Sequence, residues 1–278
     1  IEQIRKIAER ERAPIYVVGK TTGDDRFVFE QKDGVRPIDL GMNDMFGSSP
    51  KTIMRDNTKE RVLENVTYES TKLNEYIENV LQLEAVACKD WLTNKVDRSV
   101  TGRIARQQCQ GEIQLPLSDC GVVALDYTGK AGIATSIGHA PQAALADPKA
   151  GSVLSIAEAL TNIVGANLKN GLKSVSLSAN WMWPCRNDGE DAALYSAVKA
   201  CSDFACALGI NIPTGKDSLS MTQKYGDKKV VSPGTVIISA GAEVKDVKKT
   251  VSPVVQAKDS SIYYVDFSND ELKLGGSA

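Results

Sequence analysis

Glu158 and Asn162 are the residues whose types and spacing most clearly allow chemistry. They lie four residues apart in a run from about 148 to 168 whose apolar residues recur at helical spacing, so both project from one side of a predicted helix. That side is otherwise small, and Glu158 is the only acid between Ala150 and Leu168, whereas a solvated helix face normally carries several charges. A carboxylate and a carboxamide oxygen one turn apart favour a hard cation such as Mg²⁺, and the alternative is an ordinary surface pair.

Asp119 and Lys89 are the next candidates. Asp119 precedes the run 120–126, which we expect to be the most buried strand, at a sheet edge of the kind where open α/β folds bind ligands. It would add a third oxygen side chain to the pair above, although capping the turn is an alternative role. Lys89 lies in an expected strand at 86–92 and could pair with a phosphate as a point charge, with a solvated lysine as the alternative.

Composition and motif searches exclude several other kinds of site. The 278 residues are 42% hydrophobic and 24% charged, which is typical of a globular protein, and a net charge of -2 argues against a nucleic-acid binder. The single histidine, His139, rules out zinc sites built from several histidines, and the sequence has no Gly-x-Ser-x-Gly elbow. The segments ending at Gly19-Lys20-Thr21 and Gly215-Lys216-Asp217 both lack the first glycine of a phosphate-binding P-loop.

The cysteines and the apolar runs bear on location. None of the six cysteines forms a Cys-x-x-Cys pair, so they predict thiols in a reducing cytoplasm. No apolar run approaches the roughly 18 residues of a membrane helix. The first residue is not Met and the last follow a strand-like run closely, so we expect a piece of a larger protein.

Periodicity gives the elements that must position these residues. Helices are expected at 59–84, 148–168 and about 187–208, and strands at 14–19, 26–30, 86–92, 100–106, 120–126, 132–137, 174–178, 218–221, 235–241 and 262–267. This order predicts an α/β or α+β domain, a layered fold with helices on one face of a sheet. Its strand-rich front could complete a barrel with a second copy of itself.

Six ordered motifs resemble one known family, the large single-chain phosphoribosylformylglycinamidine synthases, also called formylglycinamide ribonucleotide amidotransferases. They are Asp97-Arg98-Ser99-Val100-Thr101-Gly102, Pro116-Leu117-Ser118-Asp119-Cys120, Glu158-Ala159-Leu160-Thr161-Asn162, Ser178-Ala179-Asn180-Trp181-Met182, Gly189-Glu190-Asp191-Ala192 and Gly215-Lys216-Asp217-Ser218-Leu219-Ser220-Met221. The resemblance covers nearly the whole chain.

The resemblance implies an internal piece around the second of two modules similar to aminoimidazole ribonucleotide synthetase. Residues 1–56 would be the tail of the preceding C-terminal domain, 57–83 a linker helix and 84–250 the second N-terminal domain. Residues 251–278 would hold a linker and the first strand of the next domain. The implied fold is a mixed sheet with helices on one face, half of a barrel completed by a pseudo-symmetric partner.

The resemblance also implies a tightly bound ATP or ADP with Mg²⁺ in this module, in a structural and not a catalytic role. Asp119, Glu158 and Asn162 would be the magnesium ligands, Ser118 would contact the nucleotide through its backbone, and Lys89 would contact its phosphates. In this family His139 stands where glutamate is usual, which puts a charged role there in doubt. The family's last metal-binding aspartate falls beyond the 278 residues.

The implied activity of the whole enzyme is a glutamine-dependent ligation in purine biosynthesis, in which ATP activates a formyl amide oxygen and channelled ammonia displaces phosphate. Catalytic residues are not expected in this chain, and its partners would be nucleotide and the remaining modules, the first synthetase-like module and the glutaminase domain. Two alternatives stay open: an ATP-dependent kinase or synthetase of the same superfamily, and a non-catalytic docking domain. We also expect this chain on its own to self-associate through its exposed barrel edge.

Overall fold

The computed structural model describes residues 1–64, 67–93, 102–256 and 259–266, in two compact units with the division between Ile53 and Met54. The first unit contains α1 (Glu2–Arg10), the antiparallel pair β1 (Arg26–Phe29) and β2 (Ile38–Gly41), and α2 (Met42–Phe46). The strand predicted at 14–19 is wrong, because these residues pair with no described strand and Val18 is almost fully exposed.

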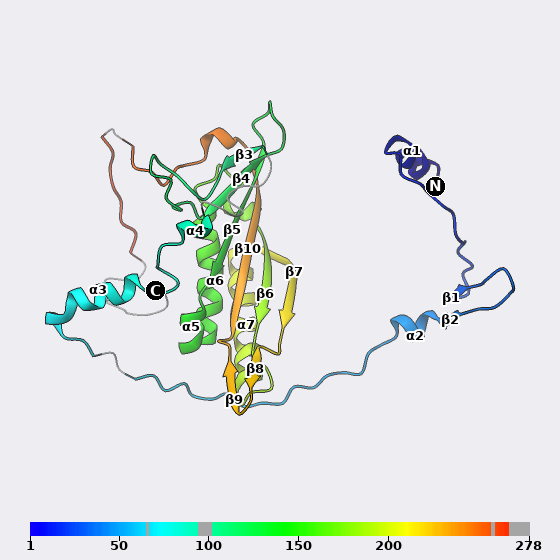
Figure 1. The fold of residues 1–278 in the computed structure, drawn as a ribbon, viewed down its shortest axis with the longest axis horizontal. Coiled ribbons are helices and arrows are strands. Elements are labelled where there is room, and N and C mark those ends of the chain that lie inside the picture. The colour runs from blue at the N-terminus through cyan, green and yellow to red at the C-terminus, as the bar shows by residue number, and fades with distance from the viewer. Residues whose placement is uncertain (65–66, 94–101, 257–258, 267–278) are drawn as a thin grey trace. The chain divides into compact units, whose positions relative to one another are not determined.

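A six-stranded mixed sheet organises the second unit (Figure 1). Its strands, in spatial order, are β3 (Ile104–Arg106), β4 (Cys120–Ala124), β5 (Gly132–His139), β10 (Thr235–Val244), β6 (Ser176–Met182) and β7 (Asn211–Ser218). Neighbours are antiparallel except β6 and β7, which are parallel. The predicted mixed α/β fold is confirmed, and within the described ranges the sheet stays open and does not close into a barrel.

Three helices cover one face of this sheet: α5 (Pro141–Ala146), α6 (Pro148–Ile163) and α7 (Glu190–Leu208). Helix α6 packs on β5 and β10 and lies beside α7 (Figure 1). Burial alternates strictly along β5, because every second side chain faces α6 and the others face away from the helices. The core therefore lies between sheet and helices, around fully buried Ile156, Ile163 and Ile238.

The small side of α6 fits closely against β5. Ser155 and Ala159 are buried there, and the Ser136 hydroxyl donates to the Ala159 carbonyl at 2.6 Å. A Cβ on Gly138 would overlap the Ser155 carbonyl and the Ala159 amide, so glycine is required for this approach. The uncharged side of the predicted helix therefore does contact another element, strand β5, close to the candidate site residues.

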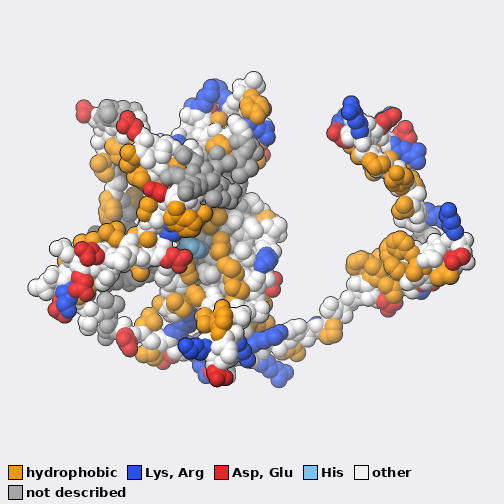
Figure 2. Space-filling model, in the orientation of Figure 1, with side chains coloured by type: hydrophobic (Ala, Val, Ile, Leu, Met, Phe, Trp, Pro, Cys, Tyr) orange, Lys and Arg blue, Asp and Glu red, His pale blue; other side chains and the backbone are white. Residues whose placement is uncertain are grey.

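The shorter elements complete the second unit. They are η1 (Ser70–Lys72), α3 (Leu73–Leu81), α4 (Asp90–Thr93), η2 (Gly171–Ser174), the hairpin of β8 (Thr222–Tyr225) and β9 (Lys228–Val231), and η3 (Val247–Lys249). The hairpin carries three lysines, and Figure 2 shows Lys and Arg side chains gathered at this end of the unit.

Several predicted elements are corrected by the structure. The helix expected at 59–84 forms only from Leu73 to Leu81, since residues around 59–61 are instead held in an extended segment by charged contacts. The strand expected at 86–92 is replaced by a turn and α4, and residues 262–266 form no strand, while Phe267 lies outside the described residues. The strand predicted at 218–221 is wrong except at Ser218, because β7 spans Asn211–Ser218 and ends there.

Candidate functional site

A cavity of about 620 Å³ lies at the junction of β4, β5 and α6. Four of the five residues singled out from the sequence line it: Ser118, Asp119, Glu158 and Asn162. Asp119 comes from the loop entering β4, while the other two oxygen side chains come from α6. The sequence placed Ser118 and Asp119 before a strand and the other two residues on one helix, and the fold brings both elements around one space.

Glu158 is held at the end of β5. Its Oε2 accepts the backbone N–H of His139 at 2.6 Å and lies 3.8 Å from Nδ1 of the same histidine. The side chains remain 56% and 45% exposed for His139 and Glu158 respectively, so this pair borders solvent. The backbone bond fixes the carboxylate against the strand and leaves Oε1 available, since Oε1 makes no hydrogen bond or ion pair with the described residues.

Asn162 is oriented by the same strand. Its Nδ2 donates to the carbonyl of Ile137 at 2.9 Å. An amide whose nitrogen is committed to a carbonyl has its oxygen left as the acceptor. The Ile137 contact therefore selects the orientation in which Asn162 presents Oδ1, an oxygen that suits a hard cation.

Asp119 and Ser118 form the loop side of the cavity. The exposed Asp119 carboxylate makes no hydrogen bond or ion pair with the described residues. Ser118 donates its backbone N–H to the Gln108 carbonyl at 3.1 Å and its hydroxyl to the Cys120 carbonyl at 3.3 Å. A backbone contact from Ser118 to a ligand would therefore use its carbonyl.

Lys89 is not brought to this cavity. It lies in the turn before α4, and its Nζ donates to the carbonyls of Glu84 and, at 3.0 Å, Ala87. The strand that was to carry it does not form, because the backbone turns after α3, with Ala87 N–H bonded to the Leu83 carbonyl at 2.7 Å. Its contact with phosphate stays a prediction.

The residues fit a magnesium ion held with the help of other oxygens. Two carboxylates and an amide oxygen face one cavity, with Asp119 unpaired and Asn162 turned by its amide nitrogen. Across the described ranges, no cluster of three or more His, Cys, Asp or Glu side chains could hold a metal. Mg²⁺ suits such a sparse set, because it keeps several waters and shares phosphate oxygens.

Sequence reasoning missed other parts of the lining, including Gln108, Thr135 and Ser239. Thr135 and Ser239 face away from the helices on β5 and β10, so the alternation of those strands was the available signal. Cys120 also lines the cavity, and burial raises the pKa of its thiol.

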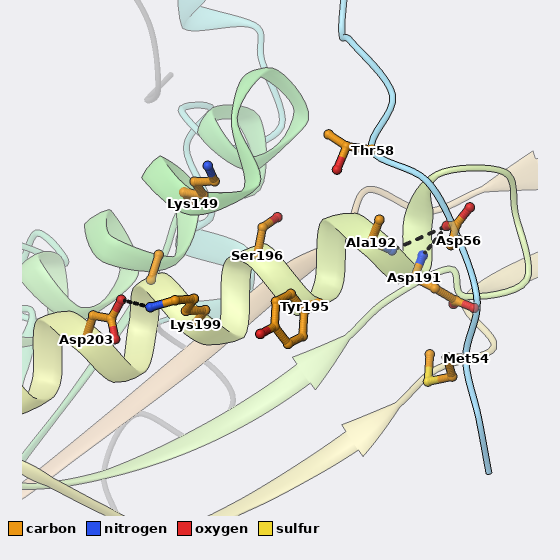
Figure 3. A pocket seen from close by; sticks show the side chains of 11 residues that line it. Met54, Asp56, Thr58, Lys149, Asp191, Ala192, Tyr195, Ser196, Lys199 and Asp203 are labelled. Carbon is orange, nitrogen blue, oxygen red and sulfur yellow. Dashed lines mark hydrogen bonds and ion pairs between the residues drawn. The ribbon is translucent and has the colours of Figure 1, made fainter.

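A second cavity, of about 630 Å³, lies at the first turns of α7 and contains none of the predicted site residues. Figure 3 shows it between α7, which carries Tyr195, Ser196 and Lys199, and an extended segment that carries Met54 and Asp56. We call residues 54–61 the strap.

Charged side chains of the strap form hydrogen bonds with backbone groups of the second unit. Asp56 accepts backbone N–H groups from Gly189 at 3.2 Å, Asp191 at 3.0 Å and Ala192 at 3.3 Å, capping α7 (Figure 3). Arg61 donates to the carbonyls of Ala144 and Leu145, both at 2.9 Å.

Two ion pairs also tie the strap to the start of α7 and to the loop before it. Arg61 pairs with Glu190 at 3.2 Å, and the other oxygen of Glu190 accepts the indole N–H of buried Trp183 at 2.9 Å. Lys59 pairs with Asp188 at 2.9 Å. Gly189 has φ +82° and touches Lys59, so a side chain there would be both strained and blocked. These charges are satisfied within the chain.

Of the helices that the structure describes, none is both long enough and apolar enough to cross a bilayer.

Known proteins match the chain along most of its length. Residues 88–243 match the family model of the FGAR-AT PurM_N-like domain. The human protein named phosphoribosylformylglycinamidine synthase is 39% identical over 291 residues, covering 98% of this chain and 22% of that protein. The *Drosophila melanogaster* protein of the same name is 37% identical over 297 residues, covering 100% of this chain and 22% of that protein. The chain thus spans about a fifth of the length of these relatives.

Solved structures share the fold. The structure of PurLQS from *Thermotoga maritima* has a TM-score of 0.54 at 13% identity, covering 82% of this chain and 33% of that one. *T. maritima* PurL complexed with ADP has a TM-score of 0.55 at 13% identity, covering 83% and 33%. The open mixed sheet with helices on one face agrees with the family match over residues 88–243. The chain belongs to the FGAR-AT PurM_N-like domain family.

Proposed function

We propose that this chain is part of a phosphoribosylformylglycinamidine synthase and supplies it with a magnesium–nucleotide site. That enzyme would be an ATP-dependent ligase of purine biosynthesis in the cytoplasm, with glutamine as amide donor. The observation that carries the site is the convergence of Ser118, Asp119, Glu158 and Asn162 on one cavity. Support for the class of ligand comes from *T. maritima* PurL, a protein of the same fold that is described in complex with ATP and with ADP.

Each candidate residue would contact the part of the ligand that its side chain or backbone suits. Asp119, Glu158 and Asn162 would hold Mg²⁺, which would neutralise phosphate charge when bound. Glu158 and Asn162 are pre-positioned by the backbone of β5, through His139 N–H and the Ile137 carbonyl. Ser118 would contact the nucleotide through its carbonyl, and Lys89 would contact a phosphate only after leaving its own turn.

The site's role would be structural. A ligand that binds only the folded state adds RT ln(1 + [L]/Kd) to stability, about 2.7 kcal/mol at a hundredfold excess over Kd. The remaining modules of the enzyme, including a glutaminase domain, would supply the catalytic residues. They would also be the partners of the open sheet face, where a pseudo-symmetric copy would complete a barrel.

The test compares Asp119→Asn and Glu158→Gln in the full-length enzyme, with Asp203→Asn as control. Asp203 is an exposed carboxylate on α7, paired with Lys199 outside the cavity. We expect the first two variants to lose co-purified nucleotide, measured by mass spectrometry, and melting temperature, more than they lose turnover. Collapse of turnover with full nucleotide content would overturn the structural role, and would favour a catalytic kinase or synthetase site instead.

A further inference from the structure

A second hollow of about 260 Å³ adjoins the candidate nucleotide cavity. The two share four lining residues: Ser118, Asp119, Cys120 and Asn162. The opposite side of the smaller hollow is formed by Arg106 and by residues 250–253, which follow β10. The chain leaving the sheet thus lies across the far side of the predicted metal ligands.

Residues 250–253 are pinned at two points. Val251 N–H donates to the Gly165 carbonyl at 2.8 Å, just past the end of α6. Arg106 Nη2 donates to the Thr250 carbonyl at 2.9 Å. Gln110 fixes the guanidinium from the other side, accepting from Nη1 at 2.7 Å. We call residues 250–253 the exit wall.

Two polar atoms beside the contact between Arg106 and Thr250 have no hydrogen-bond partner among the described residues. Arg106 Nε and the Thr250 hydroxyl are buried and make no hydrogen bond with the described residues. A buried polar group left unsatisfied costs about 1–3 kcal/mol, so such groups normally meet water or a ligand. Arg106, Asp119 and Asn162 all line this hollow, so the pinned wall and the predicted site are in spatial contact.

We propose that Arg106 is a positioning residue of the nucleotide site, holding the exit wall against Asp119 and Asn162 so that nucleotide binding and the order of residues 250–256 are coupled. This rests on the proposed function. The physical reason is pre-organisation: a wall already fixed by Arg106 and Gly165 costs less entropy to close on a ligand than a loose chain. Because the wall is the start of the chain that leaves the sheet, filling the site would restrict that chain as well.

The experiment uses the 278-residue chain with MgADP as the probe, and measures Kd by calorimetry and amide hydrogen exchange over residues 245–256. Arg106→Met removes the guanidinium, and Val251→Pro removes the bond to Gly165 while leaving Arg106 intact. Arg103→Met is the matched control, since Arg103 lies at the same edge, donates to the Leu125 carbonyl and lines neither hollow. Melting temperatures show that each variant is folded.

In the wild-type chain MgADP should slow exchange at residues 250–256. Arg106→Met and Val251→Pro should each raise Kd about tenfold and abolish that slowing, because a pre-organised wall is lost. Arg106→Lys should recover part of the affinity, whereas Arg103→Met should match wild type. A purely structural Arg106 would lower the melting temperature with Kd within twofold of wild type, which would overturn this inference alone. A wild-type chain that binds no MgADP would overturn this inference, whereas the proposed function is tested separately by the nucleotide content of the full-length enzyme.

Discussion

The second unit has charged residues in two regions, the strap and the candidate site, and their contacts differ. At the strap, Asp56 and Arg61 find backbone groups and Glu190 as partners within the chain. At the candidate site, Asp119 makes no ion pair with the described residues, and Asn162 uses its nitrogen while leaving its oxygen free. The same residue types are structural where the chain completes their contacts, and available to a ligand where it does not.

Cavity volume does not distinguish the strap from the candidate site. The strap cavity, at about 630 Å³, is as large as the candidate site's, at about 620 Å³. The strap cavity is lined mostly by charges already committed, such as Lys199 to Asp203 at 2.6 Å, and by Lys149, whose ammonium group makes no ion pair with the described residues. The two volumes are equivalent, whereas hydrogen-bond accounting favours the β4–β5–α6 junction as the proposed ligand site.

The largest expected effect comes from the contact that builds the site. Gly138→Ala would force a methyl group into the α6 backbone, so we expect a loss of about 1–3 kcal/mol of unfolding free energy, as for other overpacked cores. Glu158 would move away from His139 N–H at the same time, weakening MgADP binding. Gly241→Ala is the control, since its methyl would meet nothing within 4 Å. Denaturant unfolding of both variants checks the prediction, and equal stabilities would contradict it.

The next largest effect is expected when one carboxylate is removed from each region in turn. Asp56→Ala should lower the melting temperature through loss of the α7 cap, with MgADP affinity unchanged. Asp119→Asn should do the opposite in the nucleotide-free chain, weakening MgADP binding with little change in melting temperature. Calorimetry and thermal unfolding on both variants separate the effects. If Asp56→Ala weakened binding as much as Asp119→Asn, the two regions would not be independent.

A smaller effect is expected on the melting temperature at acidic pH. Backbone N–H groups of Asn57, then of Ala192, Gly189 and Asp191, hold the pKa of Asp56 below its ordinary 3.8. Since the folded pKa is the lower one, this contribution to stability is present above the unfolded pKa and is lost as pH falls through the folded value. The difference in melting temperature between wild type and Asp56→Ala should therefore be constant near neutral pH and shrink below about pH 3.8. A difference that grew on acidification would contradict the capping role.

The smallest expected effect is on thiol reactivity. Burial raises the pKa of Cys185, beside the strap-capped end of α7, to about 12, and burial also raises that of Cys120 at the candidate site. Both should alkylate slowly near neutral pH, while the exposed Cys88 and Cys206 react quickly. MgADP should slow the reaction of Cys120 further and leave Cys185 unchanged, as followed by mass spectrometry of peptides. Equal protection of both would deny that the ligand binds beside Cys120.

The candidate site was predictable where local rules hold. Glu158 and Asn162 share a helix face because of their i, i+4 spacing, and Asp119 precedes a strand that does form as β4. The close fit of Ser155 and Ala159 on β5 also follows from the lack of charge on that face. These features depend on residues near one another in the sequence.

Long-range contacts account for what was missed. Helical periodicity suggested a helix from residue 59, but Lys59 and Arg61 are held by partners more than a hundred residues away, at Asp188 and Glu190. Strand β7 shows no apolar alternation, because it is an exposed edge strand that is held by parallel pairing with β6. The exit wall depends on Arg106 meeting Thr250, which no local pattern indicates.

The central claim is a magnesium-dependent nucleotide site at Asp119, Glu158 and Asn162. Its most direct test is a calorimetric titration of ADP into the wild-type chain with and without Mg²⁺, repeated for Asp119→Asn. We expect heat from the wild type only with Mg²⁺ present, and an affinity at least about tenfold weaker for the variant, a difference of about 1.4 kcal/mol. Equal affinity in wild type and variant, or binding that ignores Mg²⁺, would contradict the account.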